Sequence, residues 1–336
     1  MAMTLADMKA GMSDKVAQQV VDTFLRESEI LQVLPFDNTV SPSGGSTLTY
    51  AYMQTKIPGT AAFRKLNAEY SAQEATLEKK SADLKIFGGK FGMDRVLKQA
   101  EGRFNNMAYQ MEQKIKAAVS LFHFTLINGN STTTADEFDG LDKMLAGTST
   151  EYNTGAVLDI SDMAKLKTNA DQLYEYLQTL IRDTEADAIL LNTKMLGKIQ
   201  TMARLLGYKT ESEEAFGKKV VSMDGVRFMD LKNHYIVTPG EEEDDPATVT
   251  ATACVKDGIS RTVSTAQTGL TDIYAVKFDV NDGFHAATIT GNSAISQYVP
   301  DFTKPGAVKE GEVEMVAAAI LKNTRHAGVL RNVKIA

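Results

Sequence analysis

Residues 108–130 read AYQMEQKIKAAVSLFHFTLINGN and carry the strongest periodic signal in the sequence. Apolar side chains recur every three or four positions over residues 104–128, which predicts a helix with one buried stripe. The members of this stripe are Phe104, Ala108, Met111, Ile115, Ala118, Phe122 and Leu126. Asn128 and Gly129 predict the end of the helix, because glycine commonly follows a last helical turn. A helix of about 25 residues would be roughly 37 Å long, so we expect it to cross a whole domain.

The loop after this helix, NGNSTTTADEFDGLDKML at residues 128–145, gathers carboxylates beside hydroxyl and amide groups. A hard cation such as calcium prefers oxygen ligands of this kind. The carboxylates are those of Asp136, Glu137, Asp139 and Asp142. The calcium-loop template nevertheless fails at both ends, because placing Gly140 at its glycine position leaves Ala135 and Ala146 at the first and last ligand positions.

We therefore interpret this loop as a turn that leads from the long helix into the next domain. The centre of the turn is formed by Phe138, Asp139, Gly140 and Leu141. The two apolar side chains are expected to return the chain to the core, and the carboxylates to serve as turn and capping groups. Cation binding in another loop geometry stays open as an alternative.

The segment before residue 40 predicts an amphipathic arm. Its apolar residues recur at helical spacing and require a partner surface. They include Met8, Met12, Val16, Val20 and Phe24.

Residues 41–97 predict a long β-hairpin. STLTYAYMQTK (46–56) and ADLKIFGGKFGMDRVL (82–97) have alternating patterns typical of strands, and a polar excursion of about twenty residues separates them. An isolated hairpin is marginally stable in water, so we expect it to lie on a neighbouring subunit. Charged residues of both signs would then set the register between subunits. The candidate contact residues are Arg64, Lys65, Glu69, Glu74, Glu78, Lys79 and Lys80.

The remaining sequence predicts helices packed on the faces of a sheet. Ser161 is expected to cap a helix, ADAILLN (186–192) to form a buried strand, and Asn192 to cap a further helix that stops at Gly207. Strand patterns follow from Lys218 onward, and residues 313–335 predict two strands around a turn near His326. The fold class predicted from this pattern is α+β.

Composition and motifs exclude several classes of protein. The chain has 336 residues, 43% apolar content and a formal net charge of -7, which argues against a protein whose main contact is a nucleic-acid backbone. No signal-peptide-like or membrane-spanning run of apolar residues occurs, so we expect a cytoplasm-like compartment and no membrane partner. The four histidines are widely spaced, and Cys254 is interpreted as a buried apolar side chain. We predict no catalytic, cofactor or metal site, and no enzyme activity.

The order of elements resembles the major capsid protein family of tailed bacteriophages. Four stretches carry the resemblance: AEYSAQEATLEKKSADLKIFGGKFGMDRVL (68–97), the long helix followed by EFDGL (137–141), DAILLNTKMLGKIQTM (187–202), and GKKVVSMDGVRFMDL (217–231). The family fold would imply five parts. These are an N-terminal arm at 1–40, an extended loop at 41–97, a peripheral domain with the spine helix at 98–145, an axial domain at 146–285, and return strands of the peripheral domain at 286–336.

The resemblance also implies a function and partners. The chain would assemble with itself, through hexamers and pentamers, into an icosahedral shell around packaged double-stranded DNA, which it would contact without sequence specificity. Further partners would be a separate scaffolding protein, a portal and decoration proteins. The product would be part of a virion that is assembled in the cytoplasm of a bacterial host.

Two alternatives stay open. The first is the shell of an encapsulin-like nanocompartment that encloses a protein cargo. The second, from another class, is a soluble α/β enzyme whose site combines the carboxylates at 136–142 with one histidine.

Overall fold

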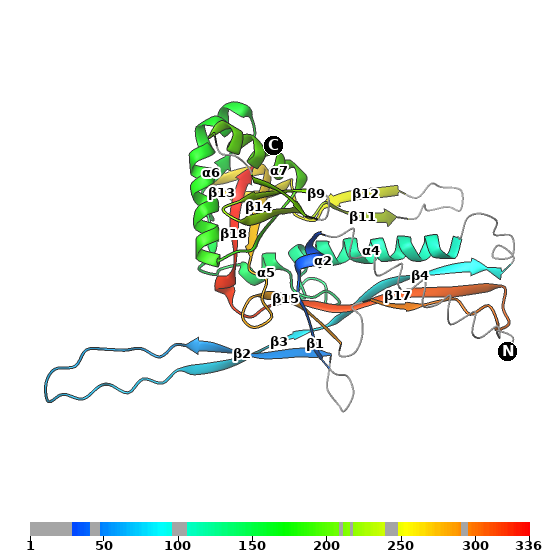
Figure 1. Cartoon of the computed structure of the whole chain (residues 1–336), viewed down its shortest axis with the longest axis horizontal. Coiled ribbons are helices and arrows are strands. Elements are labelled where there is room, and N and C mark those ends of the chain that lie inside the picture. The colour runs from blue at the N-terminus through cyan, green and yellow to red at the C-terminus, as the bar shows by residue number, and fades with distance from the viewer. Residues whose placement is uncertain are drawn as a thin grey trace.

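The computed structural model describes residues 29–40, 48–95, 106–207, 211–215, 218–238, 248–289 and 295–336. Within these residues the chain is α+β, as predicted, with two large sheets and two protruding two-stranded hairpins (Figure 1). The predicted N-terminal contact residues lie outside the described part of the chain; they are Met8, Met12, Val16, Val20 and Phe24. No helix among the described residues is long and apolar enough to span a lipid bilayer.

The predicted long helix is α4, Asn106–Asn128. Its buried stripe includes Met111, Ile115, Phe122 and Leu126, as the periodicity predicted. The helix ends where Asn128 and Gly129 were expected to end it, and the Gly129 amide donates to the carbonyl of Thr125. The stripe packs against a five-stranded sheet, which supplies the apolar partner that such a stripe requires.

This five-stranded sheet is centred on β17, Val308–Leu321. One edge of β17 pairs with β15 (Phe284–Ile289) and then with β16 (Ile295–Tyr298), and the other edge pairs with β4 (Lys85–Asp94). Strand β1, Phe36–Val40, adds to β15 in the parallel direction. The short helix α2, Glu29–Val33, buries Ile30 and Leu31 in the same core.

The nine-stranded sheet holds the second apolar core. Its main order is β5-β18-β14-β7-β10-β9-β8, with β6 beside β18 and β13 beside β14. The strands are β5 (Glu151–Tyr152), β6 (Leu158–Asp159), β7 (Ala188–Leu191), β8 (Glu211–Ala215), β9 (Lys218–Met223), β10 (Val226–Asp230), β13 (Ile259–Val263), β14 (Thr265–Val276) and β18 (Ala327–Lys334). All four residues of β7 are buried, which confirms the strand predicted at this position.

Two helices pack with this sheet: α6, Met163–Thr184, and α7, Thr193–Leu205. The side chain of Asn192 accepts a hydrogen bond from the Met195 amide, so the predicted cap of α7 is confirmed. The predicted cap of α6 at Ser161 is wrong. Asp162 is the N-cap instead and accepts from the Lys165 amide, because a carboxylate one residue later reaches the first free amides of the helix.

Two strand assignments differ from the prediction. The hairpin pairs β2 (Thr49–Ile57) with β3 (Thr76–Asp83), whereas the expected return strand, β4, pairs with β17. Of the expected return strands at 286–336, β16 and β17 lie on the sheet under α4, but β18 pairs with β14 in the larger sheet. Alternating apolar patterns show that a segment is a strand without showing its partner. The five-part division of the chain stays a prediction.

Candidate assembly surfaces

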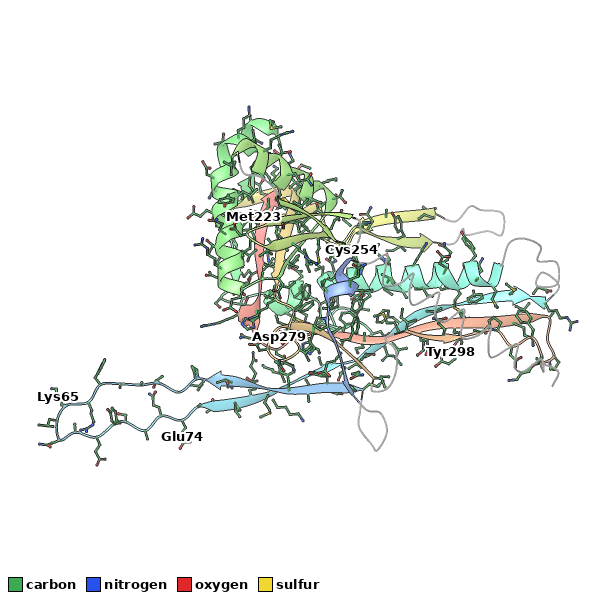
Figure 2. The ribbon with its side chains drawn as sticks, in the orientation of Figure 1. Lys65, Glu74, Met223, Cys254, Asp279 and Tyr298 are labelled. Carbon is green, nitrogen blue, oxygen red and sulfur yellow. The ribbon has the colours of Figure 1, made fainter. Side chains whose placement is uncertain are left out.

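The hairpin formed by β2 and β3 is an arm that leaves the body of the molecule (Figure 1). Beyond Ile57 and before Thr76 every side chain is exposed. Large apolar side chains are among them, since Phe63 is fully exposed and Leu66 is 90% exposed. Figure 2 shows Lys65 at the end of the arm farthest from the body and Glu74 closer to the start of β3. Exposed apolar groups on a projecting element commonly mark an interaction site.

The base of the arm, in contrast, is fixed to the body. The Tyr50 hydroxyl donates to a carboxylate oxygen of Asp37 at 2.6 Å, and the Tyr52 hydroxyl donates to the carbonyl of Leu321 at 3.1 Å. The Gln54 side-chain amide donates to the carbonyl of Lys322 at 3.0 Å. A cavity of about 490 Å³ lies between this base, β17 and the turn after α4. The arm is therefore a projection held at one end.

The predicted charged contact residues all lie on this arm. Glu78 pairs with Lys80 at 3.1 Å, and the hydrogen bond and charge of that ammonium lower the pKa of the Glu78 carboxyl. The Arg64 guanidinium lies 5.6 Å from the centre of the Tyr70 ring and donates to the carbonyl of Ala68. The other candidates are also on the arm and exposed; they are Lys65, Glu69, Glu74 and Lys79. Their role in contacts between subunits stays a prediction.

The turn after α4 is tightly packed. Phe138 is buried against Phe122 of the helix, with ring centres 5.9 Å apart, and Leu141 is fully buried at the start of α5, Leu141–Leu145. The Gly140 amide donates to the carbonyl of Gly129 at 2.8 Å. A Cβ added at Gly140 would lie 2.6 Å from backbone oxygens at the end of α4, so only glycine allows this close approach.

Two of the four carboxylates of this turn bind cationic side chains of the same chain, and Glu137 instead accepts from the Asn130 amide at 3.3 Å. Asp139 accepts from Lys143 at 2.7 Å and from the Ser131 amide at 2.9 Å, while Asp142 pairs with Arg331. Among the described residues no group of three acidic, histidine or cysteine side chains could hold a metal ion. The geometry favours the interpretation of these residues as parts of a turn.

Arg331 is the centre of a charge cluster that the sequence interpretation missed. The guanidinium is 7% exposed, and it donates to Glu151 at 2.8 Å, to Asp272 at 2.9 Å, and to Asp142. Arg261 also binds both carboxylate oxygens of Asp272, each at 2.6 Å. Burial alone would raise the pKa of the Asp142 carboxyl, but the hydrogen bond and charge of Arg331 outweigh burial and lower it.

This cluster lies beside a cavity of about 440 Å³, where the turn after α4 meets β5, β14 and β18. Its signal in the sequence was one charge inside each of two apolar stretches, Asp272 in TGLTDIYAV and Arg331 in GVLRNV. Buried charges in apolar strands are usually paired. The cluster fastens the turn to the larger sheet by ion pairs, and its carboxylates are occupied by arginines.

The remaining candidate reactive groups are packed. Burial lowers the pKa of His123 to about 4 and raises the pKa of the Cys254 thiol to about 12. His234 lies against Phe124, with ring centres 5.3 Å apart, and its Nδ1 is 3.0 Å from the Ser120 hydroxyl. The buried His285 lies against the Tyr50 ring. These environments suit packing rather than nucleophilic or general-base chemistry.

The structure also has a second projecting hairpin, which the sequence analysis did not predict. It pairs β11 (Asn233–Thr238) with β12 (Thr248–Ala253), and it lies along α4 (Figure 1). Neither strand contains a charged residue, and Tyr235 and Val249 are more than half exposed. An uncharged exposed strand pair is uncommon on a monomeric protein, because free strand edges associate.

No protein-family model matches this sequence, and neither does any curated protein. Solved structures do match over most of both chains. The holo-SrpI encapsulin complex of Synechococcus elongatus PCC 7942 has 12% identity and a TM-score of 0.57, with 91% of this chain and 87% of that chain covered.

Two capsids match similarly. The capsid of a native GTA particle has 13% identity, a TM-score of 0.55, and coverage of 93% of this chain and 90% of that chain. The mature capsid of bacteriophage PhiM1 has 10% identity, a TM-score of 0.50, and coverage of 90% and 86% respectively. At these low sequence identities, the similarity shows a shared fold and no more. The chain has the HK97-like fold of phage major capsid proteins, a fold that it shares with an encapsulin.

Proposed function

We propose that this chain is the major capsid protein of a tailed phage, which assembles through hexamers and pentamers into an icosahedral shell around double-stranded DNA. The observation that carries the proposal is the arm formed by β2 and β3. Its tip is fully exposed and rich in apolar side chains, and its base is hydrogen-bonded to the body. A neighbouring subunit would cover this surface and would stabilise the arm.

Several further observations support a structural role without enzyme activity. Asp139 of the turn after α4 and the carboxylates of the Arg331 cluster bind cations of the same chain, and His285 and Cys254 are buried. The solved structures with this fold named above are shells. In this proposal the chain acts with a separate scaffolding protein, a portal and decoration proteins, and its contact with DNA is weak and independent of base sequence.

The alternative within the same fold is an encapsulin-like shell that encloses a protein cargo, and the match to the encapsulin complex supports it. Size-exclusion chromatography followed by negative-stain microscopy tests both shell functions. We expect particles in the megadalton range, with or without an added scaffold. A subunit that stays monomeric under all of these conditions would exclude both.

The contents of the particles distinguish the two proposed shell functions. We expect particles purified from the natural host to protect double-stranded DNA against added nuclease. Nuclease-sensitive particles that contain a stoichiometric second protein would instead identify a nanocompartment. A monomer that turns over a substrate through Asp139 or Asp142 would support the soluble-enzyme alternative.

A further inference from the structure

His285 is buried at the base of the arm, where the arm is hydrogen-bonded to the body. It lies on β15, and its side chain is closed to solvent. The imidazole Nδ1 is 3.5 Å from the carbonyl oxygen of Gly283, at the outer limit of a hydrogen bond. Nε2 has no hydrogen-bond partner among the described residues. This site suits a neutral imidazole, because the charged form has two N–H donors and would need a second acceptor.

The imidazole packs against the innermost anchor of the arm. Its ring centre is 5.7 Å from that of Tyr50 on β2, and the two rings meet edge to face. Tyr50 is 7% exposed, and its hydroxyl donates to the Asp37 carboxylate of β1 at 2.6 Å. Strand β1 pairs with β15, and Asp37 lies opposite Ala287. These contacts join one strand of the arm to two strands of the body.

The charged and titratable groups that act on this imidazole, among the described residues, are Asp37, Asp279, Lys322 and Tyr50. The ammonium of Lys322 donates to the carbonyl of Val280 at 2.7 Å and lies 5.3 Å from the centre of the Tyr50 ring. Burial, the largest effect, and the charge of Lys322 lower the pKa of His285 below its ordinary value of 6.5. The two carboxylates and the Gly283 carbonyl oppose this shift without cancelling it. The imidazole is therefore neutral at neutral pH.

Acid would change the donor that Asp37 accepts from. A protonated His285 is a cation close to a carboxylate that already accepts from the Tyr50 hydroxyl. Hydrogen bonds from a charged donor are roughly twice as strong as those between neutral groups, so the imidazolium would compete with Tyr50 for this carboxylate. The Tyr50 hydroxyl would then lose its acceptor in a buried position, which favours movement of the arm away from the body.

The direction of the pH effect follows from proton binding. With the arm base open, the imidazole has about its ordinary pKa of 6.5, and with the base closed it has a lower pKa. The open state therefore binds more protons, so its population rises as the pH falls below about 6.5 and stops rising at the pKa of the closed state. At pH 5 a free imidazole is charged about 30 times more often than neutral, which limits the effect to about 30-fold.

We propose that His285 is a pH-sensitive switch of the arm: its protonation transfers the Asp37 carboxylate from Tyr50 to the imidazolium and loosens the base of the arm. The switch lies within one chain, so the inference goes beyond the proposed shell function and does not depend on it. The bonds of Tyr52 and Gln54 to body carbonyls contain no group that titrates near pH 6, and they keep the loosened arm attached.

A distance measurement between arm and body tests the switch. Spin labels at K79C on the arm and K167C on α6 occupy two exposed positions, and the native Cys254 is buried. Double electron–electron resonance on labelled chain, diluted with excess unlabelled chain, gives the distance distribution whether or not the chain assembles. We expect one narrow distance at pH 7.5, and a second, broader population that grows by about fivefold or more at pH 5.

Substitutions identify the titrating group. H285Q and H285F remove the titration, and we expect the second population to change by less than about twofold between the two pH values. H234Q is the matched control, because His234 also has a lowered pKa but lies beside α4, and it should respond to pH as the unaltered chain does.

Two further variants separate the exchange of partners from simple loss of packing. Y50F keeps the ring but frees Asp37 for the imidazolium, so the pH midpoint of opening should rise. D37N removes the carboxylate that favours the charged imidazole, so the midpoint should fall.

Three results would each overturn the switch. These are an unaltered chain with the same distances at both pH values, a pH response retained by H285Q or H285F, and midpoints that Y50F and D37N leave unchanged. Loss of the far-ultraviolet circular dichroism signal at pH 5 would also overturn it, because acid would then unfold the whole chain rather than loosen the arm.

Discussion

Arg331 connects three carboxylates that come from distant parts of the sequence, and its guanidinium is almost fully buried. In the described part of the chain, removing the arginine leaves the largely buried Glu151 and the partly exposed Asp142 without a cationic partner, and unpaired buried charge is costly. We expect R331M to lower the free energy of unfolding by about 3 to 5 kcal/mol. Urea unfolding of the unassembled subunit, followed by circular dichroism, measures the change.

The matched control is Lys143→Met, which removes the partly exposed pair with Asp139. Exposed pairs contribute about 0 to 1 kcal/mol, so this variant should unfold near the midpoint of the unaltered subunit. Equal effects of the two changes would contradict the structural role of the buried cluster.

The same cluster makes stability depend on pH. The Asp142 carboxyl has a folded pKa below its ordinary value of 3.8, because hydrogen bonding and charge from Arg331 outweigh the effect of burial. A depressed folded pKa stabilises the native state above the unfolded pKa, and this contribution is lost as the pH falls through the folded value. We expect the urea midpoint of the subunit to fall between about pH 5 and pH 2 by more than that of D142N, which lacks this titration.

The comparison with D142N isolates the residue because the other carboxylates titrate in both proteins. Parallel curves for the two proteins over this acid range would show that Asp142 adds nothing to the pH dependence.

At the scale of elements, the junction of α4 and α5 depends on backbone contact at Gly140. A methyl group there would meet the carbonyls of Thr125 and Ile127 at 2.6 Å. Overpacking of this kind costs about 1 to 3 kcal/mol, and we expect G140A to lower the free energy of unfolding by that amount. G155A is the control, because a methyl group at Gly155 meets nothing within 4 Å. An unchanged urea midpoint for G140A would show that the turn can relax at no cost.

Local signals predicted the elements well. The stripe of α4, the Asn192 cap of α7 and the buried strand β7 each depend on residues close in sequence. Strand pairing was harder to predict, because β4 and β18 pair with strands that are distant from them in the sequence. Arg331 and Asp142 are 189 residues apart, and no local pattern connects them. The sequence predicted the turn after α4, but it did not predict the Arg331 cluster that fastens this turn to the larger sheet.

At the scale of the whole molecule, we expect the projecting arm to be the element through which subunits assemble. Replacing residues 58–75 by Asn-Gly would join Ile57 and Thr76, which are paired in the hairpin, through a two-residue turn. The removed side chains are all exposed, so the free energy of unfolding should change by less than about 0.5 kcal/mol. We expect the shortened subunit to stay folded and to form no particles.

Circular dichroism and urea unfolding test whether the shortened subunit stays folded. Size-exclusion chromatography tests whether it forms particles. Particles at the unaltered yield would show that the tip has no part in assembly. Loss of the folded subunit would show that the tip supports the body.

The placement of β17 and β18 has a consequence for the order of events during synthesis. Each occupies an inner position of its sheet, and both follow all the other described strands in chain order. A ribosome exposes the chain from its N-terminus, so a nascent chain that has emerged only as far as β16 lacks the central strand of one sheet and an inner strand of the other. Neither sheet can complete its hydrogen bonding between strands at that stage. Products of translation interrupted before β17 would therefore lack an inner strand of both sheets and would leave both apolar cores incomplete.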